Sequence, residues 1–243
     1  TEVLKMGYYI YGWRGVPVSI ECLGEKANAT RPEIEQIIIS NSKGVDEETF
    51  ERELYVVRRR IEKAAAVAGV RDLYIASLSC RSIIYKGMML AEQVAEFYPD
   101  LKDERFESDF AIYHQRYSTN TFPQWWLAQP FRMLAHNGEI NTLKGNLNWM
   151  RSHEIRMASS AFGDLAEDIK PIVPHGSSDS AALDSVFEVL VRAGRSAPMA
   201  KVMLVPEAWS KQAGEMPQAW ADMYNYANST MEPWDGPAAL AMT

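Results

Sequence analysis

The sequence predicts an α+β fold, in which short paired strands and several helices are built from one globular chain. Short apolar runs bounded by Gly, Pro and Asn clusters indicate the strands. Longer segments repeat their apolar residues every three to four positions, which indicates helices. No internal repeat or low-complexity linker divides the 243 residues, so we expect one large domain or two small ones.

Composition and charge exclude several classes of function. Hydrophobic residues make up 47% of the chain and charged residues 23%, which is typical of a soluble globular protein. The formal net charge of −7 argues against a nucleic-acid or anionic-membrane surface, because neutralising phosphates needs a basic face. No apolar run is long enough to span a bilayer, and no signal peptide is visible. Two cysteines without a CxxC pair exclude a disulfide framework and the common structural zinc sites, so we expect reduced thiols in a cytoplasmic protein.

Six segments have the composition of strands. They are residues 6–18, 32–40, 73–85, 106–117, 131–135 and 202–205. The second and the last are expected to be short buried strands. The third is expected to be a hairpin, with apolar runs at 73–78 and 83–85 around the tip Ser79-Cys80-Arg81-Ser82.

The clearest helix begins after Asp46, which can cap it, and ends at Gly69, which suits the left-handed position that follows a helix. Three arginines at positions 58–60 lie in its middle. Because acidic residues at 51, 53 and 62 surround them, we expect a solvated helix face rather than a nucleic-acid patch. Further helices are expected at 91–97, 143–158, 179–193 and 217–227.

The common catalytic motifs are missing. The sequence contains no phosphate-binding GxxxxGK[ST] or GxGxxG loop, no HExxH, no GxSxG and no EF-hand loop. A metal site remains an alternative, with ligands drawn from His114, His136, His153 and His175 and a carboxylate such as Glu154 or Asp179. No two histidines have the i, i+4 spacing of paired ligands on a helix, so hydrogen-bonded structural histidines are the simpler interpretation.

Three residues could be nucleophiles. Cys80 would lie at the hairpin tip beside Arg81, which favours the thiolate, whereas Cys22 lies in a polar segment. A structural thiol is the commoner role for both cysteines. Thr1 could act with its own amine as base, but a truncation boundary explains it better, and we expect the chain to be a fragment of a longer protein.

The most informative residues lie at two predicted strand ends and one predicted helix start. Arg116 offers a planar fork for a carboxylate. Asn137 offers a side-chain amide and Gly138 a backbone N–H, and two such donors make an oxyanion hole, worth on the order of 3 kcal/mol per donor. Asp179, in Gly176-Ser177-Ser178-Asp179-Ser180, could pair with an ammonium group. An Arg with an Asp recognises both α-groups of an amino acid.

Each of these residues also has a purely structural interpretation. An Asn-Gly pair is most often a hairpin turn, a Ser-Asp pair before a helix is most often a cap, and Arg116 could form a structural ion pair. Together and in this order, the three segments are far more specific than any one of them alone.

The segments resemble the class II glutamine amidotransferase (glutaminase) domain of the large subunit of glutamate synthases. The resemblance is carried by HQRYSTNTFPQWWLAQPFRMLAHNGEINTLKGNLNWM (114–150) and GSSDSAALD (176–184). YGWRGVPV (11–18), LYIASLSCRSIIYKGM (73–88) and EPWDGPAALAMT (232–243) look similar to the same family. The aromatic insert at 122–126 favours glutamate synthases over other class II amidotransferases, which share only the HxRYST and HNG cores.

The resemblance implies a four-layer αββα sandwich of the N-terminal-nucleophile hydrolase type. Residues 1–243 would form a single partial glutamine amidotransferase type 2 domain, incomplete at both ends. An amino-terminal Cys would attack the glutamine amide and release ammonia, which reacts with 2-oxoglutarate at a second site, and FMN and an iron–sulfur cluster supply electrons that reduce the imine to glutamate. Arg116 would bind the α-carboxylate and Asp179 the α-amine, and Asn137 and Gly138 would form the oxyanion hole.

The chain departs from the family at its start. The family's Cys-Gly-Val/Ile-Gly opening does not occur at Thr1, and neither Cys22 nor Cys80 lies in such a setting. We therefore expect this piece alone to lack the nucleophile and to be inactive, with no cofactor or metal of its own. The implied partners are L-glutamine, downstream synthase domains of the same polypeptide, and an NADPH-oxidising small subunit or ferredoxin. The alternatives are the glutaminase of another class II amidotransferase, a His-based metallohydrolase and a non-catalytic amino-acid-binding module.

Overall fold

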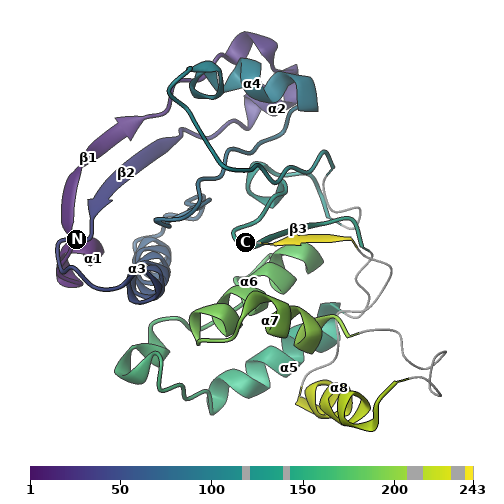
Figure 1. The fold of residues 1–243 in the computed structure, drawn as a ribbon. Coiled ribbons are helices and arrows are strands. Elements are labelled where there is room, and N and C mark those ends of the chain that lie inside the picture. The colour runs from purple at the N-terminus through teal and green to yellow at the C-terminus, as the bar shows by residue number, and fades with distance from the viewer. Residues whose placement is uncertain (117–120, 139–142, 207–215, 231–238, 243) are drawn as a thin grey trace. The chain divides into compact units, whose positions relative to one another are not determined.

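The structure is a computed structural model that describes residues 1–116, 121–138, 143–206, 216–230 and 239–242. It divides into two compact units, Thr1–Arg132 and Met133–Thr243 (Figure 1). The described residues form helices and two antiparallel two-stranded sheets, one in each unit, in agreement with the predicted mixture of helices and strands. In the described part of the chain, no helix is both long enough and apolar enough to cross a membrane.

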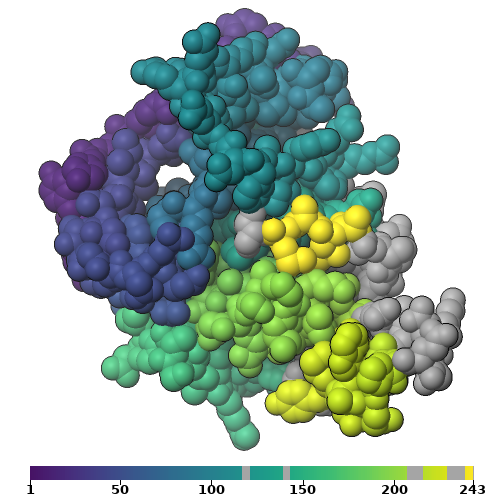
Figure 2. All heavy atoms as spheres, in the orientation of Figure 1, coloured from purple at the N-terminus to yellow at the C-terminus, as the bar shows by residue number. Residues whose placement is uncertain are grey.

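The sheet of the first unit pairs β1 (Tyr9–Gly15) with β2 (Glu35–Ser40). Helix α1 (Glu2–Lys5) precedes β1, and the short helices η1 (Ile20–Cys22) and α2 (Glu25–Ala29) connect the two strands. Isoleucines of both strands pack on a buried cluster, while aromatic side chains of β1 are exposed (β1 is purple in Figure 2). The expected buried strand at 32–40 is therefore only half buried, because one face of the sheet carries the packing.

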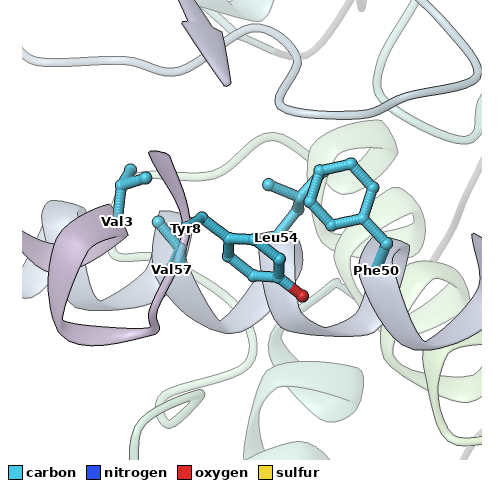
Figure 3. Close-up of a cluster of buried hydrophobic side chains, with 5 residues drawn as sticks. All are labelled: Val3, Tyr8, Phe50, Leu54 and Val57. Atoms are coloured by element: carbon cyan, nitrogen blue, oxygen red, sulfur yellow. The ribbon is translucent and has the colours of Figure 1, made fainter. Parts of the chain in front are cut away.

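Helix α3 (Glu47–Val67) forms as the sequence predicts. The Asp46 carboxylate accepts a hydrogen bond from the Thr49 N–H at 3.0 Å, and Gly69 follows the helix with φ of +79°. The apolar face of the helix packs against α1 and the start of β1. Figure 3 shows this cluster, which consists of Val3, Tyr8, Phe50, Leu54 and Val57.

The arginines of α3 are not a solvated face. Arg58 and Arg59 are 3% and 4% exposed, and both form ion pairs with Glu62. A third guanidinium, that of Arg132, lies 3.5 Å from the same carboxylate and donates from Nε to the Ile75 carbonyl at 3.1 Å. The acidic neighbour therefore neutralises the arginines inside the unit, and the prediction of a solvated face is wrong for Arg58 and Arg59.

A second cluster of the first unit surrounds Trp125. It includes side chains of α4 (Val94–Phe97), η3 (Pro99–Lys102) and η4 (Trp125–Leu127), and the short helix η2 (Ala91–Gln93) leads into α4. The Trp125 ring lies 5.6 Å from the Phe97 ring, and its Nε1 donates to the Ala27 carbonyl at 3.1 Å. Trp125 of the aromatic insert is thus part of the core of this unit, whereas Phe122 is exposed.

Two expected strand regions of the first unit have no ladder in the structure. Residues 73–85 are not a hairpin, and residues 106–116 are not a strand; residue 117 lies outside the described ranges. Side chains bind the backbone of the first region instead. The Cys80 N–H donates to Glu51 Oε1 at 2.6 Å, and the Ile84 N–H donates to Ser77 Oγ at 3.3 Å.

The second unit is mostly helical. It contains α5 (Leu143–Ile155), η5 (Gly163–Glu167), α6 (Asp179–Arg192), α7 (Ala197–Leu204) and α8 (Gln218–Thr230), and β3 (Leu134–His136) pairs with β4 (Leu240–Met242). The helices expected at 143–158, 179–193 and 217–227 are confirmed within a few residues. The strand expected at 202–205 is wrong, because Ser196 caps a helix that continues through this apolar run.

Replacing Gly87 tests the packing around Trp125. A Cβ at position 87 would lie 2.4 Å from Trp125 Cζ3, and a ring that packs on Phe97 and is hydrogen-bonded to Ala27 cannot move aside cheaply. We expect Gly87→Ala to lower the free energy of unfolding by about 2 kcal/mol in urea titrations. Gly15→Ala is the control, because no atom lies within 4 Å of its added methyl group. Equal midpoints for the two variants would contradict this packing.

Replacing Glu62 tests the arginine cluster. Burial alone would raise the pKa of its carboxyl, but the charges of Arg58, Arg132 and Arg59 outweigh burial and hold the pKa below its ordinary value. We expect Glu62→Gln to cost about 3 kcal/mol at pH 7, because it removes the charged partner that the buried Arg58 and Arg59 share with the half-buried Arg132.

The pH dependence of this loss follows from the lowered pKa. The ionised carboxylate contributes stability above the unfolded-state pKa of about 4.3, and this contribution is lost as pH falls through the lower folded-state pKa. The difference between wild type and Glu62→Gln should therefore shrink in unfolding titrations carried out at progressively lower pH. A difference that stays constant down to strongly acidic pH would exclude the carboxylate charge as its cause.

Candidate functional site

Asn137 follows β3 and is held by a pair of bonds to one residue. Its backbone N–H donates to the Ala239 carbonyl at 3.4 Å, and its side-chain Oδ1 accepts from the Ala239 N–H at 3.0 Å. Because the amide oxygen is engaged, the group that this exposed side chain presents to a ligand is the Nδ2 donor. A donor on a restrained side chain is what an oxyanion hole requires.

Gly138 has its N–H engaged inside the same corner. It donates to Nδ1 of His136 at 3.2 Å, and His136, the last residue of β3, is 4% exposed. Nδ1 is the acceptor in this bond, a role that an imidazole nitrogen can have only when it carries no proton. Of the two roles that the sequence left open for His136, metal ligand or hydrogen-bonded structural histidine, this bond fits the second, and the i, i+2 spacing to Gly138 was the signal for the turn.

Asp179 is the first residue of α6 and is 6% exposed. The cap of the helix is the preceding residue, Ser178, whose Oγ accepts from the Ala181 N–H at 3.1 Å. Asp179 Oδ1 accepts from the Ser180 N–H at 2.7 Å. The interpretation of this segment as a cap therefore applies to Ser178, and the Asp179 carboxylate lies at the positive end of the helix dipole.

Asp184 is a polar residue that the sequence reasoning did not single out. It is 1% exposed, and its Oδ1 accepts two backbone hydrogen bonds, from Met133 at 2.8 Å and from Leu134 at 3.2 Å. The available signal was a second carboxylate, five residues after Asp179, in a helix whose neighbouring residues are apolar. Its partners are about fifty positions away, so sequence alone could not identify them.

Arg116 lies in the first unit, exposed, in a segment without regular secondary structure. Its carbonyl oxygen is 2.7 Å from Nδ1 of His114, and its own N–H is 3.1 Å from the same atom. Within the described ranges, its guanidinium forms no ion pair, so the structural alternative gains no support. Asn137, Gly138 and Asp179 all belong to the second unit, and a cleft shared with Arg116 stays a prediction. Residues 117–120, 139–142, 232–238 and 243 of the quoted motifs lie outside the described ranges.

Cys80 does not have the properties of an activated nucleophile. Partial burial, together with the hydrogen bond and the negative charge of Glu51, raises the pKa of its thiol to about 11. Arg81, expected to favour the thiolate, forms ion pairs with Glu47 and Glu48 instead. The alternative of a thiolate nucleophile at a hairpin tip therefore gains no support, and the raised pKa agrees with the structural role that the sequence favours for Cys80. The other thiol, Cys22, donates to the Ser19 carbonyl at 3.2 Å.

The histidine-based metal alternative finds no support in the described residues. No group of three His, Cys, Asp or Glu side chains there could hold a metal ion. His153 stacks on Trp149 with ring centroids 5.9 Å apart, and the Glu154 carboxylate accepts from the Ile172 N–H. An open surface hollow of about 620 Å³ along residues 157–167 contains none of the candidate site residues.

Comparison with known proteins gives one consistent answer. Residues 1–243 match the family described as Glutamine amidotransferases class-II. The chain is 67% identical to the large chain of glutamate synthase [NADPH] of Azospirillum brasilense over 243 residues, which are all of this chain and 16% of that protein. It is 46% identical over 238 residues to the corresponding large chain of Bacillus subtilis, covering 98% of this chain and 16% of the relative.

A plant relative gives the same result. The chain is 47% identical over 238 residues to the chloroplastic ferredoxin-dependent glutamate synthase of Oryza sativa, which covers 96% of this chain and 15% of that protein. The chain thus spans about a sixth of the length of these relatives. The family match extends over both compact units. This chain belongs to the class II glutamine amidotransferases.

Proposed function

We propose that this chain is the glutaminase part of a glutamate synthase large chain. It binds L-glutamine, and hydrolysis of the side-chain amide releases ammonia for reductive transfer to 2-oxoglutarate, giving glutamate. The family match and the 67% identity to a glutamate synthase large chain support this assignment. The observation that carries it is Asn137, whose amide oxygen is bound by Ala239 so that its NH₂ group remains to donate.

The site residues divide the work of binding and catalysis. The Asp179 carboxylate, buried at the start of α6, receives the α-ammonium group of glutamine. Arg116 binds the α-carboxylate through its planar guanidinium. Asn137 Nδ2 and the Gly138 N–H donate to the oxygen of the side-chain carbonyl, which becomes negatively charged when a nucleophile adds to the carbon. Fixed donors at this position lower the barrier because they need no reorganisation during the reaction.

The whole protein supplies the rest of the reaction. A leading Cys in the complete domain forms the thioester with the glutamyl group, and the complete domain has the four-layer αββα architecture implied by the family. FMN and an iron–sulfur cluster belong to the synthase domains. Relatives are named for NADPH and for ferredoxin, so both electron donors fit the proposal.

Glutamine binding tests the proposal directly. We expect the chain to bind L-glutamine in calorimetry, and Asp179→Asn or Arg116→Ala to weaken binding by roughly ten- to hundredfold, because each removes a charge-assisted hydrogen bond. D-glutamine should bind more weakly, since its amine and carboxylate cannot reach both residues with the side chain in place.

Arg105→Ala is the matched control for Arg116. Arg105 is an exposed arginine of the same unit, and its guanidinium pairs with Asp103 at 2.7 Å. Its removal should leave glutamine affinity unchanged. Equal losses in the two arginine variants would show that overall charge, rather than a specific contact, governs binding, and would count against the assigned site.

The reactivity of Cys80 tests whether a thiol of this chain is the nucleophile. We expect its reaction with iodoacetamide, followed peptide by peptide by mass spectrometry, to rise with pH with a midpoint near 11, because only the thiolate reacts. The nucleophile of a glutaminase needs a much lower midpoint. A midpoint below about 8, together with ammonia release that Cys80→Ala abolishes, would identify Cys80 as the nucleophile and refute the proposed role of a leading Cys.

A further inference from the structure

We propose that Asp184 is a positioning residue for the glutamine site. Its carboxylate holds the start of β3 against α6, and it thereby fixes the Asn137–Gly138 corner relative to Asp179. The consequence for glutamine binding rests on the proposed function. The attachment of β3 to α6 rests only on contacts within the second unit.

The contacts join the two elements that carry the site. Asp184 Oδ1 accepts from two consecutive backbone N–H groups, those of Met133 and Leu134, at 2.8 Å and 3.2 Å. Leu134 is the first residue of β3, and the other end of the strand leads into Asn137. The strand is paired with β4 along its length and is bound by Asp184 at its start. The backbone at the start of the strand is thus bonded to α6 through one carboxylate oxygen.

Both bonded positions lie close to the candidate site. Asp184 follows Asp179 by five residues, which is about 7.5 Å along a helix axis. Asn137 follows Leu134 by three residues, which is about 10 Å along a strand. Because helices and strands transmit small displacements with little loss, a shift of β3 at Leu134 moves the Asn137 amide relative to the Asp179 carboxylate.

A carboxylate at this position is unexpected for packing alone. Neighbouring α6 residues Leu183, Val186 and Phe187 are at most 2% exposed, and an apolar side chain would suit their surroundings. Burying a carboxylate is unfavourable unless hydrogen bonds compensate for the lost hydration. Asp184 accepts two such bonds from the strand, and a charged acceptor binds them more strongly than a neutral one.

The test compares two ligands that differ at one end. L-glutamine contacts Asp179 and Arg116 through its α-groups and Asn137 through its amide, whereas L-norvaline has the same α-groups and no amide. Dissociation constants for both are measured by calorimetry with the full 243-residue chain. The dissociation constant of norvaline divided by that of glutamine reports how well the Asn137 corner is placed. Loss of folded protein does not change this ratio.

Asp184→Ala should weaken glutamine binding by about tenfold and change norvaline binding less than twofold, because only the amide subsite moves. Asp184→Asn should stay close to wild type, since its Oδ1 still accepts both bonds. Ser185→Ala is the control, because the hydroxyl of this buried α6 residue bonds, among the residues that the structure describes, only to the Ala181 carbonyl of its own helix. If the Ala variant does not fold, Asp184→Glu takes its place. The longer side chain displaces the strand, so this variant should also lower the ratio of the norvaline to the glutamine dissociation constant.

Amide hydrogen exchange provides a second measurement that does not depend on glutamine. In Asp184→Ala, exchange at Asn137 and Gly138 should accelerate at least severalfold, while amides of the β1–β2 sheet in the first unit keep their wild-type rates. An unchanged ligand ratio, equal losses for both ligands, or an Asn variant that behaves like the Ala variant would overturn the positioning role. If the wild-type chain does not bind glutamine, the proposed function fails. Hydrogen exchange then tests the attachment of β3 by itself, and unchanged rates at Asn137 in Asp184→Ala would overturn it.

Discussion

Buried backbone N–H groups need hydrogen-bond acceptors, and in the second unit this need determines how the start of β3 is held. Two consecutive N–H groups at the start of β3, those of Met133 and Leu134, both donate to one oxygen of the buried Asp184 carboxylate. The first unit uses the same solution where its chain is irregular. The buried Lys86 ammonium donates to the carbonyls of Trp126 at 2.9 Å and Ala128 at 2.8 Å, and the Glu51 carboxylate accepts from Cys80. Charged side chains therefore hold the segments that lie outside the sheets.

This constraint explains which elements the sequence could predict. Helix α3 has its signals within a few residues of its ends, with Asp46 bonded to Thr49 and Gly69 in the left-handed conformation. Helices α5, α6 and α8 show the same local periodicity, and they form close to where it predicts them. Whether residues 73–85 and 106–116 form strands depends on the presence of partner strands, which no local pattern specifies. An apolar run such as 202–205 suits either a strand or the end of a capped helix, and Ser196 decides for the helix.

The candidate site divides in the same way. Asn137, Gly138 and Asp179 could be proposed from residue type and spacing, because amide, N–H and carboxylate chemistry belongs to single residues. What holds each of them could not be proposed. Asn137 is bonded to Ala239, about a hundred positions away, and β3 is bonded to Asp184, about fifty positions away. Burial also reversed one expectation, because Glu62 draws Arg58 and Arg59 into the unit instead of leaving them in water.

Under the proposed function, the two oxyanion donors differ in whether they must first give up a hydrogen bond within the protein. Asn137 has its amide oxygen bound, so its NH₂ group is already oriented and costs little to use. The Gly138 N–H is engaged with His136 Nδ1 at 3.2 Å and must give up that bond to reach an oxyanion. The exchange is favourable only when negative charge develops on the substrate oxygen, since a charged acceptor outcompetes a neutral imidazole. The Gly138 N–H would then bind the transition state more strongly than it binds the uncharged amide of bound glutamine. Such a difference in binding accelerates a reaction.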